Sequence, residues 1–184
     1  MRLGERLPRG NRGTLLGVMK DVDEQGRQVF EAFARARIGA LLRYGHLLTG
    51  NPHAAEDLVQ SALAKSLASW RRIERDDPEG YVRRCMVNEA ISHTRRRAWR
   101  ERTVDVLPER GVEDERNDDR TVVMRALAEL PPRQRAVLVL RYYEDRSEEE
   151  IASMLGIARG TVKSQASKGL AHLRSSLGEL EVTR

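Results

Sequence analysis

The sequence has few of the residues that many small, stable folds depend on. It contains one cysteine, Cys85, and only 4% aromatic residues among its 184. A single cysteine excludes an internal disulfide, and the few scattered histidines also exclude a zinc site of the usual Cys/His spacing. We expect Cys85 to be an ordinary packed residue. The shortage of large apolar side chains favours two thin helical bundles over one thick core.

Long apolar runs are also missing. No stretch approaches the ~18 residues that would cross a bilayer, and the first residues contain no apolar segment suited to a signal peptide. We therefore expect a cytoplasmic protein without membrane insertion. Hydrophobic residues make up 40% of the chain and charged residues 33%, which is typical of a globular protein rather than a disordered one.

Charge is unevenly distributed along the chain. Seven arginines and two glutamates lie between Tyr81 and Arg102, whereas seven acids and three arginines lie between Thr103 and Arg120. Four basic residues and no acid lie between Ile157 and Arg174. Two basic blocks therefore flank an acidic one, in a chain whose net charge is +5.

The periodicity of apolar residues divides the chain into two helical modules. Residues 1–26 lack periodicity and are predicted to form a disordered basic tail. Residues 27–102 carry apolar residues every three or four positions in three helices. The periodicity of the first begins at Val29, and Thr49-Gly50-Asn51-Pro52 should end it. A polar loop from Arg71 to Pro78 precedes the third helix and ends in the helix-start signal Asp76-Asp77-Pro78. Residues 103–118 mix Pro, Gly and acids, which predicts a flexible acidic linker. A second helical module is expected over 119–178, followed by a C-terminal tail, 179–184. Within it, Pro131-Pro132 should end a first short helix, and a second should run from Arg133 to Tyr143.

The segment SEEEIASMLGIARGTVKSQASKGLAHLR has the pattern of a DNA-binding helix-turn-helix. Ser147 and Glu150 have the spacing of a capping box, and Gly156 permits a tight turn at positive φ. Val162 and Ala166 would place the second helix on the core. The side chains expected to face outward, where they could bond base edges or phosphates in a major groove, are Lys163, Ser164, Gln165, Ser167 and Lys168.

The predicted fold class is all-α, with two small helical domains joined by a flexible acidic linker and a helix-turn-helix in the second. The motif alone does not identify the class of DNA-binding protein. A repressor, a response-regulator output domain and a polymerase specificity subunit all carry it. The simplest alternative is a surface helix with a few solvated lysines, but the absence of acids between Ile157 and Arg174 argues against this.

The first module adds a second signal. An acidic and amide face, AEDLVQ, precedes a helix that ends in HTRRRAWR, which predicts a protein-docking surface beside a phosphate-binding ridge. From about Val29 to Leu177 the chain resembles the extracytoplasmic-function sigma factors, the smallest members of the sigma-70 family. The segments PPRQRAVLVLRYYED and GTVKSQAS are similar to its SigE-like subfamily.

The resemblance implies a function and partners for both modules. The first would be sigma region 2, which binds core RNA polymerase and melts the promoter −10 element, and the second would be sigma region 4, which binds the −35 element. The implied partners are core polymerase, through the clamp helices of its largest subunit and its flap, promoter DNA, and an anti-sigma factor. The acidic linker would thread the RNA path of the polymerase, although a simple soluble spacer explains its composition equally well.

The resemblance also assigns individual residues. Asn88 would read a −10 base, with Ser92 one turn further on the same face. Gln165 stands where many members have Arg, so the −35 sequence cannot be carried over from them, because an amide favours adenine and a guanidinium favours guanine. The core polymerase contacts would be Glu56, Asp57, Leu58 and Gln60, and the phosphate contacts around the −10 element would be Arg95, Arg96 and Arg97.

Two other classes of function remain open from the sequence. A stand-alone helix-turn-helix regulator would bind operators as a dimer without polymerase. A metal-dependent hydrolase would have to use His46, His53, Glu56 and Asp57, and these are more simply explained as surface groups. We therefore predict no enzyme activity, no catalytic residue, no metal site and no cofactor.

Overall fold

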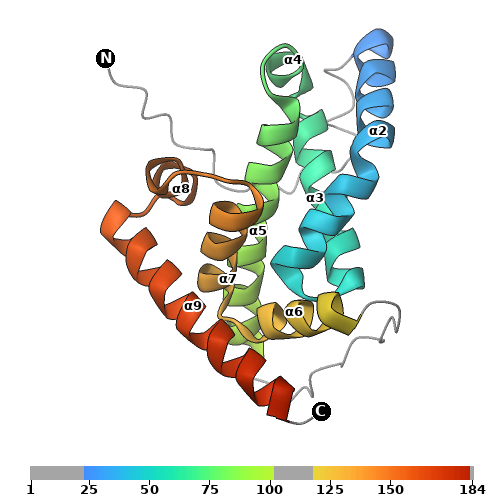
Figure 1. The fold of residues 1–184 in the computed structure, drawn as a ribbon. Helices are drawn as coiled ribbons and strands as arrows, with labels where there is room; N and C mark the ends of the chain where they lie inside the picture. The colour runs from blue at the N-terminus through green and yellow to red at the C-terminus, as the bar shows by residue number, and fades with distance from the viewer. Residues whose placement is uncertain (1–22, 102–117, 183–184) are drawn as a thin grey trace.

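The computed structural model describes residues 23–101 and 118–182, and side chains within 23–92 and 122–178. The predicted N-terminal tail up to residue 22, the acidic linker up to residue 117 and the last two residues lie outside the described part. The described residues fold into helices (Figure 1): α2 (Glu24–Thr49), α3 (Pro52–Leu67), α4 (Trp70–Ile73), α5 (Pro78–Glu101), α6 (Asp118–Glu129), α7 (Pro132–Leu138), the π-helical turn η1 (Val139–Tyr143), α8 (Glu148–Leu155) and α9 (Arg159–Val182).

The long helix α2 begins and ends at residues that satisfy its free backbone groups. The Asp23 carboxylate accepts a hydrogen bond from the Gly26 N–H at 2.8 Å, which places the helix start five residues earlier than the apolar periodicity predicts. At the other end Gly50 adopts φ +70° and donates its N–H to the His46 carbonyl. The predicted end of this helix is thereby confirmed.

The first module is a bundle of α2, α3 and α5 (Figure 1). Helices α2 and α3 approach closely because Gly45 has no side chain: a Cβ there would lie 3.2 Å from the Ala55 Cβ. A second apolar cluster closes the upper end of the bundle, where Trp70 lies edge-on to Phe30 at 5.0 Å. Trp70 begins the short helix α4 in the first part of the predicted polar loop. The remainder of that loop ends at Asp77, whose carboxylate accepts from the Gly80 N–H and caps α5 as predicted.

In the second module α9 packs against α6, α7 and α8. Pro131 and Pro132 separate α6 from α7 as predicted, because proline is tolerated only at the first helical turn. The predicted helix to Tyr143 is α7 followed by η1, so the chain widens into a π-helical turn just before the helix-turn-helix. The all-α fold with two helical domains is confirmed.

The two modules are in contact with each other. One continuous apolar cluster runs from α2, α3 and α5 into α7, α8 and α9. Gly50 lies against α6 so closely that a Cβ there would be 2.5 Å from the Ala128 Cβ. Arg135 is buried at this junction and donates to the Leu48, Ala128 and Leu130 carbonyls, so one guanidinium satisfies the free ends of two helices.

Candidate nucleic-acid interface

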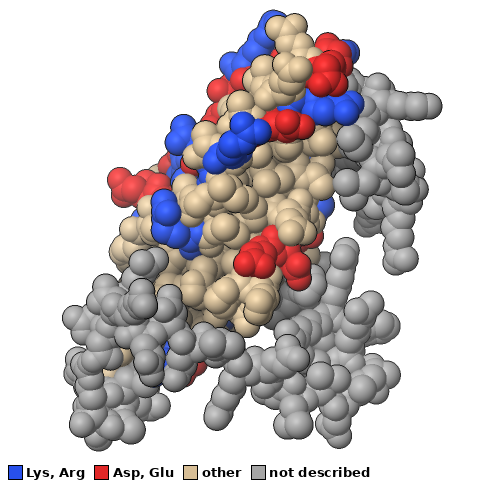
Figure 2. Space-filling view, turned by 90° about the vertical axis from the view of Figure 1, so that its right-hand side faces the viewer, with Lys and Arg blue, Asp and Glu red and all other residues tan. Residues whose placement is uncertain are grey.

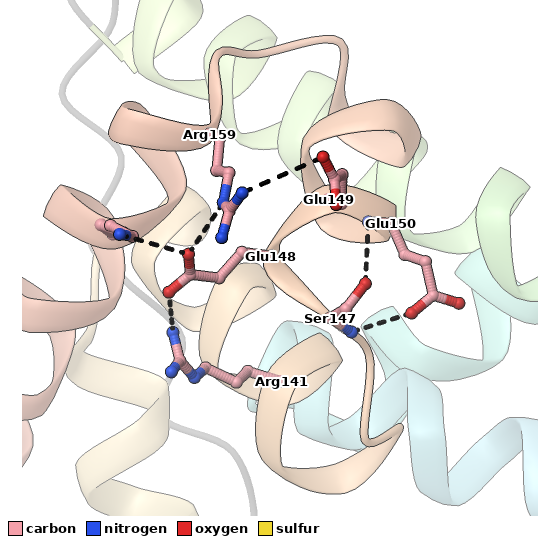
Figure 3. A network of polar contacts seen from close by, with 7 residues as sticks. Arg141, Ser147, Glu148, Glu149, Glu150 and Arg159 are labelled. Carbon is pink, nitrogen blue, oxygen red and sulfur yellow. Dashed lines mark hydrogen bonds and ion pairs between the residues drawn. The ribbon is translucent and has the colours of Figure 1, made fainter.

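The helix-turn-helix forms with the predicted local geometry (Figure 3). The Ser147 hydroxyl accepts from the Glu150 N–H at 3.2 Å, and the Glu150 carboxylate accepts from the Ser147 N–H at 2.8 Å. These bonds complete a capping box at the start of α8 and lower the pKa of the Glu150 carboxyl. The turn that follows is made at Gly156, with φ +62°.

Buried residues fix the orientation of α9. Ile151 of α8 and Val162 of α9 are fully buried, and Ala166 is 4% exposed. Further along α9 a Cβ at Gly169 would lie 3.1 Å from a Leu138 methyl group, so this glycine allows α9 to pack closely on α7. The opposite face of α9 is left exposed, and it carries Lys163, Ser164, Ser167 and Lys168, while Gln165 is partly buried.

A cluster of charges surrounds Glu148 at the start of α8 (Figure 3). Its carboxylate accepts from the Arg141 guanidinium at 2.9 Å and from the Arg159 Nε at 3.3 Å, and the Lys163 Nζ lies 3.8 Å away. Burial acts to raise the pKa of this carboxyl, but the hydrogen bonds from Arg141 and Arg159 and the charge of Lys163 together keep the pKa below its ordinary value. Glu148 is therefore ionised at neutral pH.

The −10 residues expected on the first module share one face of α5. Asn88 and Ser92 are both partly buried, one helical turn apart. The neighbouring Glu89 accepts from Ser61 and Lys65 of α3, each at 2.7 Å, which holds α5 in a fixed rotation against the bundle. Arg95, Arg96 and Arg97 belong to α5, and their side chains lie outside the described part of the chain.

Residues of both modules line one cavity. This space of about 470 Å³ is lined from α5 by Asn88 and Ser92 and from α9 by Thr161 and Gln165. The residues that line it come from α5, α7, α8, α9 and the turn between α8 and α9. We expected the loop from Arg71 to Pro78 to form the wall beside Asn88. The loop does not line this cavity, so that expectation is not met in the arrangement described here.

The expected polymerase-docking residues lie on α3. Glu56, Asp57 and Gln60 are exposed, as a docking surface requires. Leu58 differs from them, because its side chain is only 5% exposed and belongs to the apolar core. Leu58 lies three residues after Ala55 and four residues before Ala62, which are both buried in α3, so its side chain faces the core. Leu58 can support the surface from beneath but cannot contact a partner.

Figure 2 shows the side of the molecule that carries α2. Basic and acidic residues are interspersed there with broad uncharged regions, so this face does not have the single sign of charge that a phosphate-binding surface needs. The stretch of α9 from Arg159 to Arg174 differs in this respect, because none of its own residues is acidic.

Two residues named in the metal-hydrolase alternative, His53 and Glu56, lie on the surface of α3. His53 Nδ1 lies 3.9 Å from the Glu56 carboxylate, and both side chains are largely exposed. No group of three His, Cys, Asp or Glu side chains within the described ranges is placed to hold a metal ion. Among the same residues, no helix combines the length and the apolar character needed to cross a membrane.

Sequence reasoning missed the contacts that hold the modules together. Arg83 of α5 is paired with Glu144, which follows η1, and the Tyr44 and Tyr143 rings stack at 6.1 Å beside them. These residues carry no motif, and each pair is separated by tens of positions. Burial and the nearby Glu144 charge raise the pKa of the Tyr44 hydroxyl, while the opposing effects of Arg83 and Arg146 are smaller.

Two family models match the chain. The sigma-70 region 2 family matches residues 29–100, and the sigma-70 region 4 family matches residues 120–173. The two matches correspond to the two helical modules, and they include the proposed −10 face on α5 and the helix-turn-helix.

Curated relatives match most of the chain. It is 41% identical over 151 residues to an RNA polymerase sigma-E factor of Streptomyces coelicolor, covering 80% of this chain and 85% of the relative. It is 36% identical over 152 residues to the ECF RNA polymerase sigma factor SigL of Mycobacterium tuberculosis, covering 78% and 86%. Among solved structures, the chain is similar to the sigma factor RpoE of Bartonella quintana, whose structure was solved in complex with the anti-sigma factor NepR. The TM-score is 0.66 and the sequence identity 27%, and the match covers 81% of this chain and 96% of RpoE.

Proposed function

Because the chain belongs to the extracytoplasmic-function group of the sigma-70 family, it directs promoter-specific initiation of transcription, and we propose that it does so through the surfaces described above. It binds core RNA polymerase and promoter DNA. The chemistry of RNA synthesis belongs to the polymerase, and we assign no catalytic residue to this chain.

The second module is proposed to bind the −35 element through α9. Lys163, Ser164, Ser167 and Lys168 are exposed on one face, and Gln165 lies at its margin. An α-helix fits the major groove, where Lys and Gln can bond purine edges and each good contact contributes on the order of 1 to 3 kcal/mol of discrimination. This exposed face of Lys163, Ser164, Ser167 and Lys168, in a capped helix-turn-helix, is the observation that carries the proposal.

The first module is proposed to bind the −10 element through α5. Asn88 and Ser92 present an amide and a hydroxyl that can bond a base displaced from the stack. The basic stretch Arg95–Arg97, further along the same helix, would bind the flanking phosphates. Extruding a base costs roughly a few kcal/mol, and hydrogen bonds to that base offset the cost.

Core polymerase is proposed to contact Glu56, Asp57 and Gln60 of α3. These residues form an exposed acidic and amide surface on a helix whose other face is held by Glu89 of α5. The rigid support suits a docking surface, because little side-chain or backbone freedom is lost when the partner binds.

Promoter binding requires the two modules to separate from the arrangement seen here. Elements centred at −10 and −35 lie ~85 Å apart at roughly 3.4 Å per base pair, whereas α9, with 24 residues, is about 36 Å long. Asn88 and Gln165 line one cavity that is far too small for a duplex. We therefore infer that the described arrangement is the one adopted away from DNA.

Regulation and location follow as further proposals. An anti-sigma factor is a fitting partner, since the similar RpoE structure is a complex with the anti-sigma factor NepR and the likeness covers 81% of this chain. A factor that acts on RNA polymerase would work in the cytoplasm. The stand-alone regulator is disfavoured, because the region 2 match spans residues 29–100 and such a regulator has no need of that module.

Lys168→Ala provides the test of the −35 proposal. Footprinting of the holoenzyme on a promoter selected by transcription should show weaker protection of the −35 element, while the −10 element stays protected. The effect should be largest at low salt, because the contribution of a lysine that neutralises a phosphate falls as salt rises. Unchanged protection of the −35 element would contradict the assignment of α9.

A further inference from the structure

Glu148 is an acidic residue surrounded by basic side chains on the surface proposed to bind DNA. It is the first residue of α8, its side chain is 17% exposed, and its carboxylate contacts Arg141, Arg159 and Lys163 (Figure 3). Two of these three partners belong to α9: Arg159 is its first residue, and Lys163 lies about one turn further on. In a helix-turn-helix, the N-terminal part of the second helix is the part that contacts base edges.

An acid at this place weakens the attraction of the surface for phosphates. The charge of Glu148 offsets one of three neighbouring positive charges, so its simple effect is to lower sequence-independent binding. The same contacts restrict two long side chains that are otherwise exposed, Arg159 at 59% and Lys163 at 62%. Restricted side chains lose less conformational freedom when they bind a partner that fits them.

We propose that Glu148 is a positioning residue for −35 recognition, which holds Arg159 and Lys163 in the geometry that the correct element accepts. The proposal rests on the −35 function of α9 inferred above. Glu148 does not touch DNA itself; it acts through the two α9 side chains. It lowers affinity for unrelated DNA and raises the preference for the −35 element.

The test compares Glu148→Gln with the unaltered chain, both as holoenzyme with core polymerase. The probes are a promoter fragment selected by transcription and the same fragment with its −35 element scrambled. We expect the preference for the intact element to fall about tenfold in the variant. Affinity for the scrambled fragment should rise, and the plot of log affinity against log salt should steepen by about 0.9 if one freed side chain gains a phosphate contact.

Glu149→Gln is the matched control. It removes the same charge from the neighbouring position in the first turn of α8, but Glu149 is 83% exposed and its ion pair with Arg159 is long, at 3.9 Å. Both variants lose the same favourable interaction with the helix dipole. A similar loss of preference in both would mean that charge alone is responsible, and would overturn the proposal.

Two further variants separate positioning from a loss of folding. Glu148→Asp keeps the charge and should restore part of the preference. In a Lys163→Ala background, Glu148→Gln should have a much smaller effect, because the side chain it acts through is gone. If the two changes are additive, Glu148 does not act through Lys163 and the proposal fails in that form.

The outcomes also distinguish this proposal from the function on which it rests. If the unaltered holoenzyme binds both fragments equally, α9 does not read the −35 element and the proposed function is wrong. If it prefers the intact element and Glu148→Gln retains the same preference, the −35 function stands and the positioning role is wrong.

Discussion

The Arg83 guanidinium of α5 is paired with the Glu144 carboxylate, 61 residues later in the chain. The Glu144 side chain is 5% exposed, and Arg83 also pairs with Glu79 and lies 5.5 Å from the centre of the Tyr44 ring. This contact joins the module proposed to bind the −10 element to the one proposed to bind the −35 element. It lies between the parts of the molecule that we infer to separate on a promoter.

Glu144→Gln should loosen the contact between the modules. The change leaves a half-buried arginine with one acid fewer, and we expect a loss of about 2 kcal/mol in the free energy that holds the modules together. Small-angle scattering of the free protein should then show a larger radius of gyration. The exposed Glu31 offers a control of equal charge, and an equal expansion in Glu31→Gln would contradict the role of this pair.

Gly50→Ala and Gly156→Ala should differ in their effect on stability. Both glycines have positive φ, +70° and +62°, so an alanine at either position costs about 1 kcal/mol in backbone strain. At Gly50 a Cβ would collide with Ala128, whereas at Gly156 the added carbon would have no described neighbour within 4 Å apart from the adjoining residues of the chain. Thermal unfolding should show a loss of about 3 kcal/mol for Gly50→Ala. Equal losses in the two variants would show that α6 does not pack on Gly50 in solution.

Asn88→Ala should abolish promoter opening without affecting polymerase binding. The variant removes the amide proposed to bond a −10 base but leaves the exposed surface of α3 intact. Permanganate reactivity of the −10 thymines reports opening, and co-elution with core polymerase reports binding. If opening survives in this variant, the −10 assignment to α5 is wrong.

The local features of this fold could be predicted from the sequence because each depends on nearby residues. The capping box at Ser147, the turn at Gly156 and the cap at Asp77 all involve partners within a few positions. The inward position of Leu58 likewise follows from its spacing to the core residues of α3, and only the family resemblance assigned this residue to the polymerase contacts.

Contacts between the modules could not be predicted in the same way. Arg135 donates a hydrogen bond to the Leu48 carbonyl, and the two residues are 87 positions apart in the sequence. Asn88 and Gln165 line the same cavity, which exists only once both modules have folded and packed together. No periodicity or motif relates such positions. The start of α2 was missed for a smaller reason, since the cap at Asp23 precedes the first apolar residue of the helix.

The Cys85 thiol should titrate at higher pH in the folded chain than in the unfolded one. Burial raises its pKa above the ordinary value, and the weaker effects of Lys65, Tyr81 and Arg84 do not cancel this. The rate of alkylation by iodoacetamide should therefore rise with pH around a higher midpoint in buffer than in urea. Since the chain has no other cysteine, no variant is needed. Identical midpoints would show that the thiol is solvated in the folded protein.

Run-off transcription with purified core polymerase tests the proposed function most directly. With a library of genomic fragments as template, addition of the chain should produce transcripts from a defined set of start sites that core polymerase alone does not use. The fragments that respond should share one sequence near −10 and another near −35. The same start sites with and without the chain, or failure of the chain to associate with core polymerase, would contradict its action as a sigma factor.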